Sequence, residues 1–297
     1  MTELAEVAYL RLATDDVAAQ AAFAGEMIGL QSVAGGDAHD QAWFRSDIRR
    51  RTMVFFNAEM GESSVGIAYH HPDGLLRSVE RLRSAGVDVQ EQDRATCDTL
   101  FVRIAFRTRD PSGNVIDLVQ GPHHAGRRFF PARDNGIVGM ESVRLRSIGA
   151  DADSRFWTQM LGFEIRDWSG DICYLGSDDL HHRIVLYPSE RKGILGVNFA
   201  VEDFEQVMIN KYFMNDHQVR VAHGPGRDAA AGQVFLQVHG PDGLIYGLVA
   251  ETSRINPDRH RPRQFAAGNS ALCTWGSRPQ DVPEYSRAES SQGAHHD

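Results

Sequence analysis

The chain has 297 residues, which is long enough for two domains of ordinary size, each with its own core. Its net charge of −9 argues against a nucleic-acid partner, because nucleic-acid-binding surfaces concentrate positive charge. We find no run of about 18 apolar residues and no charged-then-apolar leader, so we expect a cytoplasmic protein with no membrane partner. Three widely spaced cysteines, Cys97, Cys173 and Cys273, predict buried thiols instead of disulfides.

The sequence pattern of the first half predicts two successive units, each with the order strand, helix, then two or three strands. Alternation of apolar and polar residues marks the strands, and Asp15 and Asp16 can cap the first helix. The expected elements are a strand at 7–14, a helix at 17–27, strands at 42–44, 52–57 and 64–69, a helix at 75–84, and a hairpin of strands at 101–107 and 115–119.

The second half repeats this scheme after a predicted linker at residues 121–136, which is rich in glycine and proline. Residues beyond 252 are rich in Pro, Arg, Gly and Ser, so we expect an irregular arm at 253–285 and a disordered tail at 286–297. The expected elements are strands at 142–147, 173–174, 183–187 and 196–201, with helices at 151–160 and 203–213, and then strands at 234–238 and 244–249.

An internal duplication links the two halves. Residues 8–14 and 141–147 read almost alike, and so do residues 27–31 and 160–164, at the same offset. A proline-containing turn at 110–117 returns at 240–247. The repeat predicts two domains of similar construction, at 1–120 and 137–252.

Four copies of strand–helix–strand–strand–strand in two domains resemble the vicinal oxygen chelate superfamily, which includes glyoxalases and bleomycin-resistance proteins, and especially its two-domain extradiol ring-cleaving dioxygenases. The resemblance covers about residues 4–250 and part of the tail. It implies an α+β fold of four βαβββ modules, paired into two domains that are each a curved mixed sheet forming a cup with helices outside. It also implies, by analogy, a homo-oligomer. The segments that carry it are 142–147, 156–157, 161–163, 181–186, 196–207, 241–243, 256–257 and 275–276.

In that family, two histidines and a carboxylate hold Fe(II), occasionally Mn(II), in the C-terminal cup. The matching positions are Ser142, Gly196 and Gly247, so all three family ligands are absent. We therefore expect no metal in this site and no other cofactor, with Fe(II) only if unorthodox ligands replace the usual ones.

A shift of one residue along the first strand would place Glu141 at the first ligand position. The same shift would turn the two arginines of this strand beneath a helix, which costs several kcal/mol when they have no partners. Two glycines would still not replace the other ligands. The N-terminal cup offers Tyr9, Gly66 and Asp117 at the matching places, which is no better.

The resemblance also implies a set of polar groups around the cup. The acid/base histidine of the family matches His182, a further histidine matches Asp228, and a tyrosine matches Gln237; we take His182 and Asp228 as catalytic candidates. Alternation along the strands adds inward-facing residues, and the alternative for each is a satisfied group of the core. The predicted substrate-binding residues are Ser142, Arg144, Arg146, Asn198, Gln237 and Tyr246.

Three hypotheses for function follow from this set. The first is an enzyme of aromatic-compound metabolism that needs no metal and does hydrolase, lyase or isomerase chemistry with His182, acting on a small aromatic or dicarbonyl ligand. The second is a true extradiol dioxygenase with ligands drawn from Glu141, His182 and Asp228. The third is a small-molecule-binding protein or a non-catalytic subunit.

Overall fold

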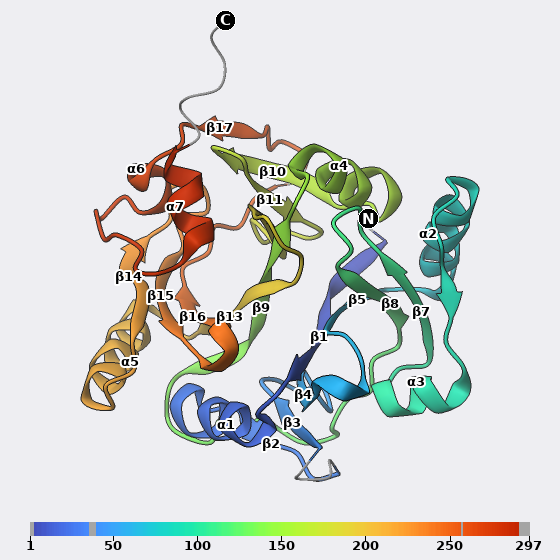
Figure 1. Cartoon of the computed structure of the whole chain (residues 1–297), viewed down its shortest axis with the longest axis horizontal. Coiled ribbons are helices and arrows are strands. Elements are labelled where there is room, and N and C mark those ends of the chain that lie inside the picture. The colour runs from blue at the N-terminus through green and yellow to red at the C-terminus, as the bar shows by residue number, and fades with distance from the viewer. Residues whose placement is uncertain (1–2, 36–39, 257, 291–297) are drawn as a thin grey trace, which may run out of the picture.

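The computed structural model describes residues 3–35, 40–256 and 258–290, which form two curved mixed sheets with helices around them (Figure 1). The first sheet has the strand order β2-β3-β4-β1-β5-β8-β7-β6, and the second has the order β14-β15-β16-β13-β9-β12-β11-β10-β17. The predicted α+β fold with curved mixed sheets is confirmed. In the described ranges, no helix is long and apolar enough to cross a membrane.

The elements of the first half are β1 (Leu4–Thr14), α1 (Val17–Ala22) continued by a π-helical turn (Phe23–Ile28), β2 (Gln31–Ser32), β3 (Gln41–Arg45), β4 (Met53–Asn57), a 3-10 turn (Ala58–Met60), β5 (Ser64–Tyr69), α2 (Pro72–Ser84), β6 (Gln90–Glu91), α3 (Arg94–Leu100), β7 (Ile104–Arg109) and β8 (Val115–Gln120).

The elements of the second half are β9 (Ile137–Ser147), α4 (Ala150–Arg155) continued by a π-helical turn (Phe156–Met160), β10 (Glu164–Ser169), β11 (Ile172–Gly176), β12 (Ile184–Pro188), β13 (Ile194–Val201), α5 (Phe204–Asp216), β14 (Val221–Arg227), β15 (Val234–His239), a 3-10 turn (Pro241–Gly243), β16 (Ile245–Ala250), β17 (Arg263–Phe265), α6 (Asn269–Leu272) and α7 (Pro283–Ser290).

The same strand pairing occurs in both sheets. In the first, β1 pairs antiparallel with β5 and parallel with β4, while β5 pairs parallel with β8. In the second, β9 pairs antiparallel with β13 and parallel with β12, while β13 pairs parallel with β16. The duplication seen in the sequence is therefore a duplication of strand order. The domain boundaries drawn above stay a prediction.

Alternation along β9 decides which residues face the cup. Val143 and Leu145 are fully buried in the main core, together with Trp157 of the helical segment outside the sheet. Arg144 lies on the opposite face and lines the cavity of the cup. The strand therefore has the register predicted without the one-residue shift. Glu141 is the extra residue of a β-bulge, because Met140 and Ser142 pair with consecutive residues of β13.

Several elements were not predicted, namely β2, β6, α3, β10, β14, β17, α6 and α7. Helix α3 shows why. Asp93 caps it by accepting a hydrogen bond from the Thr96 backbone N–H (2.8 Å), and Phe101, which was predicted to begin a strand, ends the helix with a φ of 55°. Residues 286–290 belong to α7, so the predicted disordered tail begins too early, and its residues 291–297 lie outside the described residues.

Candidate active site in the C-terminal cup

A small cavity lies against the second sheet, on the face that carries Arg144. Its free volume is about 20 Å³, which is room for about one water molecule. The sheet supplies most of the wall, and the C-terminal arm closes it with side chains from α6 and α7. The lining residues are Arg144, Tyr174, His182, Val185, Tyr187, Asn198, His223, Asp228, Gln233, Phe235, Gln237, Leu272 and Tyr285.

A buried chain of three side chains leads to this cavity. The Nε2 atom of His181 lies 2.9 Å from Oδ2 of Asp167, and the Nδ1 atoms of His181 and His182 lie 3.2 Å apart. A carboxylate only accepts, so His181 donates from Nε2 and can accept at Nδ1. His182 then donates from Nδ1, and its Nε2 atom is assigned as an acceptor.

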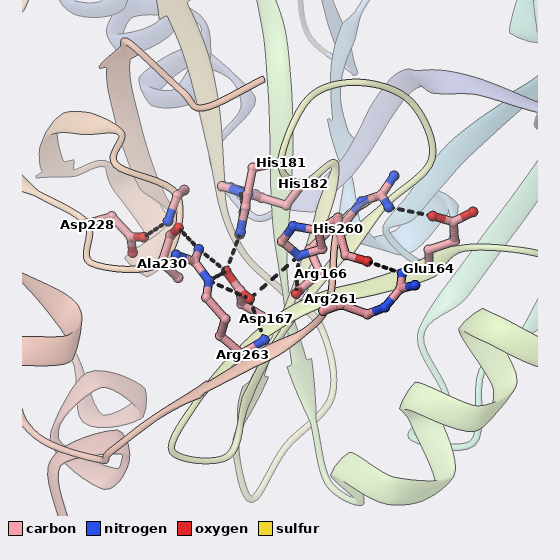
Figure 2. A network of polar contacts seen from close by, with 11 residues as sticks. Glu164, Arg166, Asp167, His181, His182, Asp228, Ala230, His260, Arg261 and Arg263 are labelled. Carbon is pink, nitrogen blue, oxygen red and sulfur yellow. Dashed lines mark hydrogen bonds and ion pairs between the residues drawn. The ribbon is translucent and has the colours of Figure 1, made fainter. Parts of the chain in front are cut away.

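Figure 2 shows Asp167 at the centre of this network, with the ring of His181 directed toward it. Asp167 also accepts from the backbone N–H of Arg263 (2.7 Å) and forms an ion pair with the guanidinium of that residue. Burial alone would raise the pKa of Asp167, but the hydrogen bonds from His181 and Arg263 lower it to about 2. The carboxylate is therefore charged and fixes the orientation of His181.

His182 is neutral in this environment. Burial lowers its pKa well below the usual value, and the positive charges of Arg183 and Arg144 act in the same direction. Its side chain is 2 % exposed and packs edge-on against the ring of Tyr174, with centroids 5.3 Å apart. Because His182 lines the cavity and its imidazole is neutral, it can take a proton from a ligand.

Asp228 lines another part of the cavity. It accepts a hydrogen bond from the hydroxyl of Tyr174 (2.8 Å) and one from the backbone N–H of Ala231 (2.6 Å). Burial raises its pKa. The Tyr174 ring also contacts both His181 and His182. This tyrosine therefore contacts both predicted catalytic residues, His182 through its ring and Asp228 through its hydroxyl.

The three positions that match the family's ligands do come together. In the strand ladder, Asn198 pairs with both Ser142 and Gly247, and Gly196 pairs with Arg144. The side chains found there are the Ser142 hydroxyl, which accepts from the amide of Asn198 (3.0 Å), and the guanidinium of Arg144, which lies over Gly196. Arg144 thus brings a positive charge to the place where the family holds a cation.

These residues do not fit a metal ion. The position holds one hydroxyl and two glycines, and the neighbouring guanidinium can only donate hydrogen bonds and repels a cation. Throughout the described part of the chain, no three His, Cys, Asp or Glu side chains gather closely enough to hold one. Glu141, the candidate in the shifted register, instead accepts from the side chains of Gln233 (2.7 Å) and Thr252 (2.6 Å).

The predicted substrate-binding residues separate into three groups. Arg144, Asn198 and Gln237 line the cavity, whereas Ser142 lies behind Asn198. Arg146 is on the same face but is not among the lining residues. It donates from Nε to Glu284 of α7 (2.6 Å) and is occupied by that ion pair.

The prediction for Tyr246 is wrong. Its ring belongs to the main core on the other face of the sheet, and its hydroxyl donates to the side chain of Gln20 in the first half (3.2 Å). The reason is alternation: Gly247 faces the cup, so its neighbour faces away.

Sequence reasoning missed Asp167 and His181, and it also missed several residues that line the cavity, among them Tyr174, His223 and Tyr285. The adjacent pair at 181–182 was a usable signal, because consecutive residues outside regular structure can both point inward. Asp167 lies on a strand that the sequence did not reveal, and Tyr285 lies on a helix of the arm. In the N-terminal cup, the ring of Tyr9 lies over Gly66 and its hydroxyl donates to Asp117 (3.1 Å).

Comparisons with known proteins agree with this architecture. No model of a known protein family matches the chain. It is 22% identical over 292 residues to a 1,2-dihydroxynaphthalene dioxygenase of Sphingobium xenophagum, covering 91% of this chain and 97% of the relative. It is 24% identical over 294 residues to an iron-dependent extradiol dioxygenase of Rhodococcus jostii (strain RHA1), covering 91% and 95%.

Among solved structures, a Mn(II)-bound glyoxalase from Novosphingobium aromaticivorans matches with a TM-score of 0.84 and 20% identity, covering 96% of this chain and 94% of that one. A halotolerant catechol dioxygenase matches with a TM-score of 0.83 and 19% identity, covering 94% and 95%. The fold is therefore that of the extradiol dioxygenases and glyoxalases. These relatives and structural neighbours are extradiol dioxygenases and a glyoxalase, which agrees with the resemblance to the vicinal oxygen chelate superfamily seen in the sequence.

These comparisons correct one prediction. We expected no cofactor, but a relative aligned over most of the chain is named as iron-dependent, and a structural neighbour holds Mn(II). The chain is thus related to metal-dependent proteins, although its own residues at the corresponding position do not fit a metal.

Proposed function

We propose that the chain is an extradiol-dioxygenase-like enzyme of aromatic-compound metabolism that carries out acid/base chemistry in the C-terminal cup. The substrate class is a dioxygenated aromatic compound or the dicarbonyl product of its ring cleavage. The observation that carries the proposal is the buried chain from Asp167 through His181 to His182, a residue that lines the cavity. The names of the relatives, which are dioxygenases of aromatic diols, support the substrate class.

In the proposed reaction, Nε2 of His182 removes a proton from a hydroxyl group, or from a carbon next to a carbonyl group. Asp167 stabilises the positive charge that develops on the two imidazoles, through its hydrogen bond with His181 (2.9 Å). Arg144 stabilises the negative charge left on the ligand oxygen. Returning the proton to another atom gives an isomerase. Loss of a leaving group, or attack of water, gives a lyase or a hydrolase.

The test uses coloured ring-cleavage products, prepared from a panel of catechols with a known extradiol dioxygenase. Loss of visible absorbance reports consumption, and NMR identifies the product. We expect His182→Gln to lower the rate by about 10²- to 10⁴-fold, the usual contribution of general acid/base catalysis. His217→Gln, which changes an exposed histidine at the end of α5, is the control and should keep full activity.

Full activity of His182→Gln would refute the role of this residue. Asp167→Asn separates positioning from catalysis, because it leaves His182 in place but removes the charge that orients His181. We expect a lower kcat and a displaced pH profile with little change in KM.

Ring cleavage by a metal-dependent dioxygenase is the second candidate, and the names of the relatives favour it. It would need ligands other than those of the family, drawn from Glu141, His182 and Asp228. Protein purified without air and supplied with Fe(II) tests it. Stoichiometric iron together with oxygen uptake on a catechol would replace the proposal above.

A further inference from the structure

Arg144 carries a buried charge without an anionic partner. Its side chain lies in the cup and is 1 % exposed. Nη2 donates to the backbone carbonyl of Ile245 (3.0 Å), Nη1 donates to the hydroxyl of Tyr285 (2.5 Å), and Nε has no partner. Among the described residues, no carboxylate forms an ion pair with it, whereas Arg146, two residues along the strand, is paired with Glu284. A buried cation without a counter-ion is costly, and a bound anion would offset that cost.

The position of this guanidinium is built into the sheet. A Cβ atom at Gly196 would lie 2.7 Å from Nη2 of Arg144, and one at Gly247 would collide with the side-chain oxygen of Asn198. Both glycines therefore leave room for the two polar side chains to lie against the sheet. That oxygen of Asn198 is also buried and has no partner. A donor, Nε of Arg144, and an acceptor, the side-chain oxygen of Asn198, thus both lack partners where these two cavity-lining side chains lie against the glycines.

Tyr285 occupies the space next to this pair. It comes from α7, which Figure 1 shows in the C-terminal part of the molecule, and its side chain is 1 % exposed. Its hydroxyl accepts from Arg144 and donates to the side-chain oxygen of Gln237 (2.7 Å). Its ring packs against Tyr187, with centroids 5.1 Å apart, and against His223, at 5.9 Å. A phenol of the chain itself therefore lies where an aromatic ligand would contact Arg144.

The remaining cavity of about 20 Å³ holds about one water molecule and cannot accept an aromatic ring beside Tyr285. Helix α7 is outside the sheets, so it can move without breaking a strand ladder. We propose that Arg144 binds an oxyanion of an aromatic ligand, and that Tyr285 fills this position until the ligand displaces it. Resting on the function proposed above, this inference narrows the substrate to a ring that carries a carboxylate or another singly charged oxygen, with a neighbouring hydroxyl for Asn198.

Calorimetric titration with benzoate, and with benzamide as its neutral analogue, tests the inference in the full-length protein. We expect benzoate to bind at least about tenfold more tightly than benzamide, because only benzoate neutralises the guanidinium. Tyr285→Ala should tighten benzoate binding by about tenfold or more, because the ligand no longer competes with the phenol. Phenol, as a second probe, distinguishes a preference for carboxylate from a preference for the ring.

Variants of Arg144 are made in the Tyr285→Ala protein. Arg144→Met should remove the preference for benzoate, and Arg144→Lys should keep part of it, because the charge remains. Equal binding of benzoate and benzamide by Tyr285→Ala would overturn the inference, even if no Arg144 variant folds. Unchanged benzoate binding in folded Arg144→Met would overturn it as well.

The same titration with His182→Gln separates this inference from the proposed reaction. Benzoate binding should persist in that variant, since His182 does not contact the guanidinium in the proposed site. Retained binding without any turnover in the wild-type protein would then refute the acid/base proposal and leave the oxyanion site standing.

Discussion

Replacing Asp167 by Asn should destabilise the protein at neutral pH, and the effect should shrink in acid. The side chain is fully buried and accepts from His181 Nε2 (2.9 Å) and from the Arg263 backbone (2.7 Å). Its folded-state pKa is about 2, against a usual value of 3.8. Above about pH 4, the charged form of Asp167 therefore contributes about 2–3 kcal/mol to the free energy of unfolding. This contribution is lost as the pH falls from 3.8 to about 2.

The assay is urea unfolding of the wild type and the variant between pH 7 and pH 3. We expect Asp167→Asn to be less stable by about 3 kcal/mol at pH 7, since it also weakens the hydrogen bonds to a buried ion-pair network. The difference should begin to narrow as the pH falls below about 4, because the wild type loses its advantage between the usual pKa of 3.8 and the folded-state pKa of about 2. Asp171→Asn, at an exposed turn beside the same strand, is the matched control. A loss below about 1 kcal/mol, or a difference that does not depend on pH, would contradict the reasoning.

Three further predictions concern other parts of the cup. Gly196→Ala should lower the free energy of unfolding by about 2–4 kcal/mol in chemical denaturation, because the added methyl group overlaps Arg144 and a backbone carbonyl of β16. Glu284→Gln should speed hydrogen exchange across α7, because it removes the charged partner of Arg146 at a cost of about 3 kcal/mol; unchanged exchange would show that this ion pair does not hold α7 on the sheet. His182→Gln should flatten the loss of stability between pH 6.5 and pH 5. Burial keeps His182 neutral when folded, so protonation of the unfolded chain costs the wild type up to about 2 kcal/mol at pH 5, and an equally steep variant would contradict this.

Much of the fold could be predicted because the sequence contains an internal duplication, so each half supports the elements predicted for the other. Alternation in the segment around Ser142 gave both the strand and the face on which Arg144 lies, and the bulge at Glu141 does not disturb that face. Strand β14 could not be predicted in this way, since Val221–Arg227 contains two glycines and a proline and lacks alternation. Pairing with β15 holds it in the sheet, which is a tertiary effect.

The site was less predictable, because its key contacts join segments that are far apart in sequence. Asp167 on β10 and His181 in the segment before β12 are only 14 residues apart, but the contact between Arg144 and Tyr285 spans 141 residues. Composition marked residues 253–285 as an irregular arm, whereas α7 is ordered because Glu284 and Tyr285 bury polar groups against partners on β9. Local sequence carries no information about such partners.

The absence of the family's ligands explains the position of Arg144 better than any single contact does. Histidine at 196 would occupy the space of the guanidinium, and a carboxylate at 247 would occupy that of the Asn198 amide, since even a Cβ atom at either glycine lies against these side chains. The small residues and the polar side chains above them therefore depend on one another. The family resemblance implies a metal cation at this place, and in this chain the guanidinium of Arg144 lies there. An oxygen anion is the ligand that either cation would attract, so recognition of an oxyanion can persist even though the residues that provide the positive charge have changed.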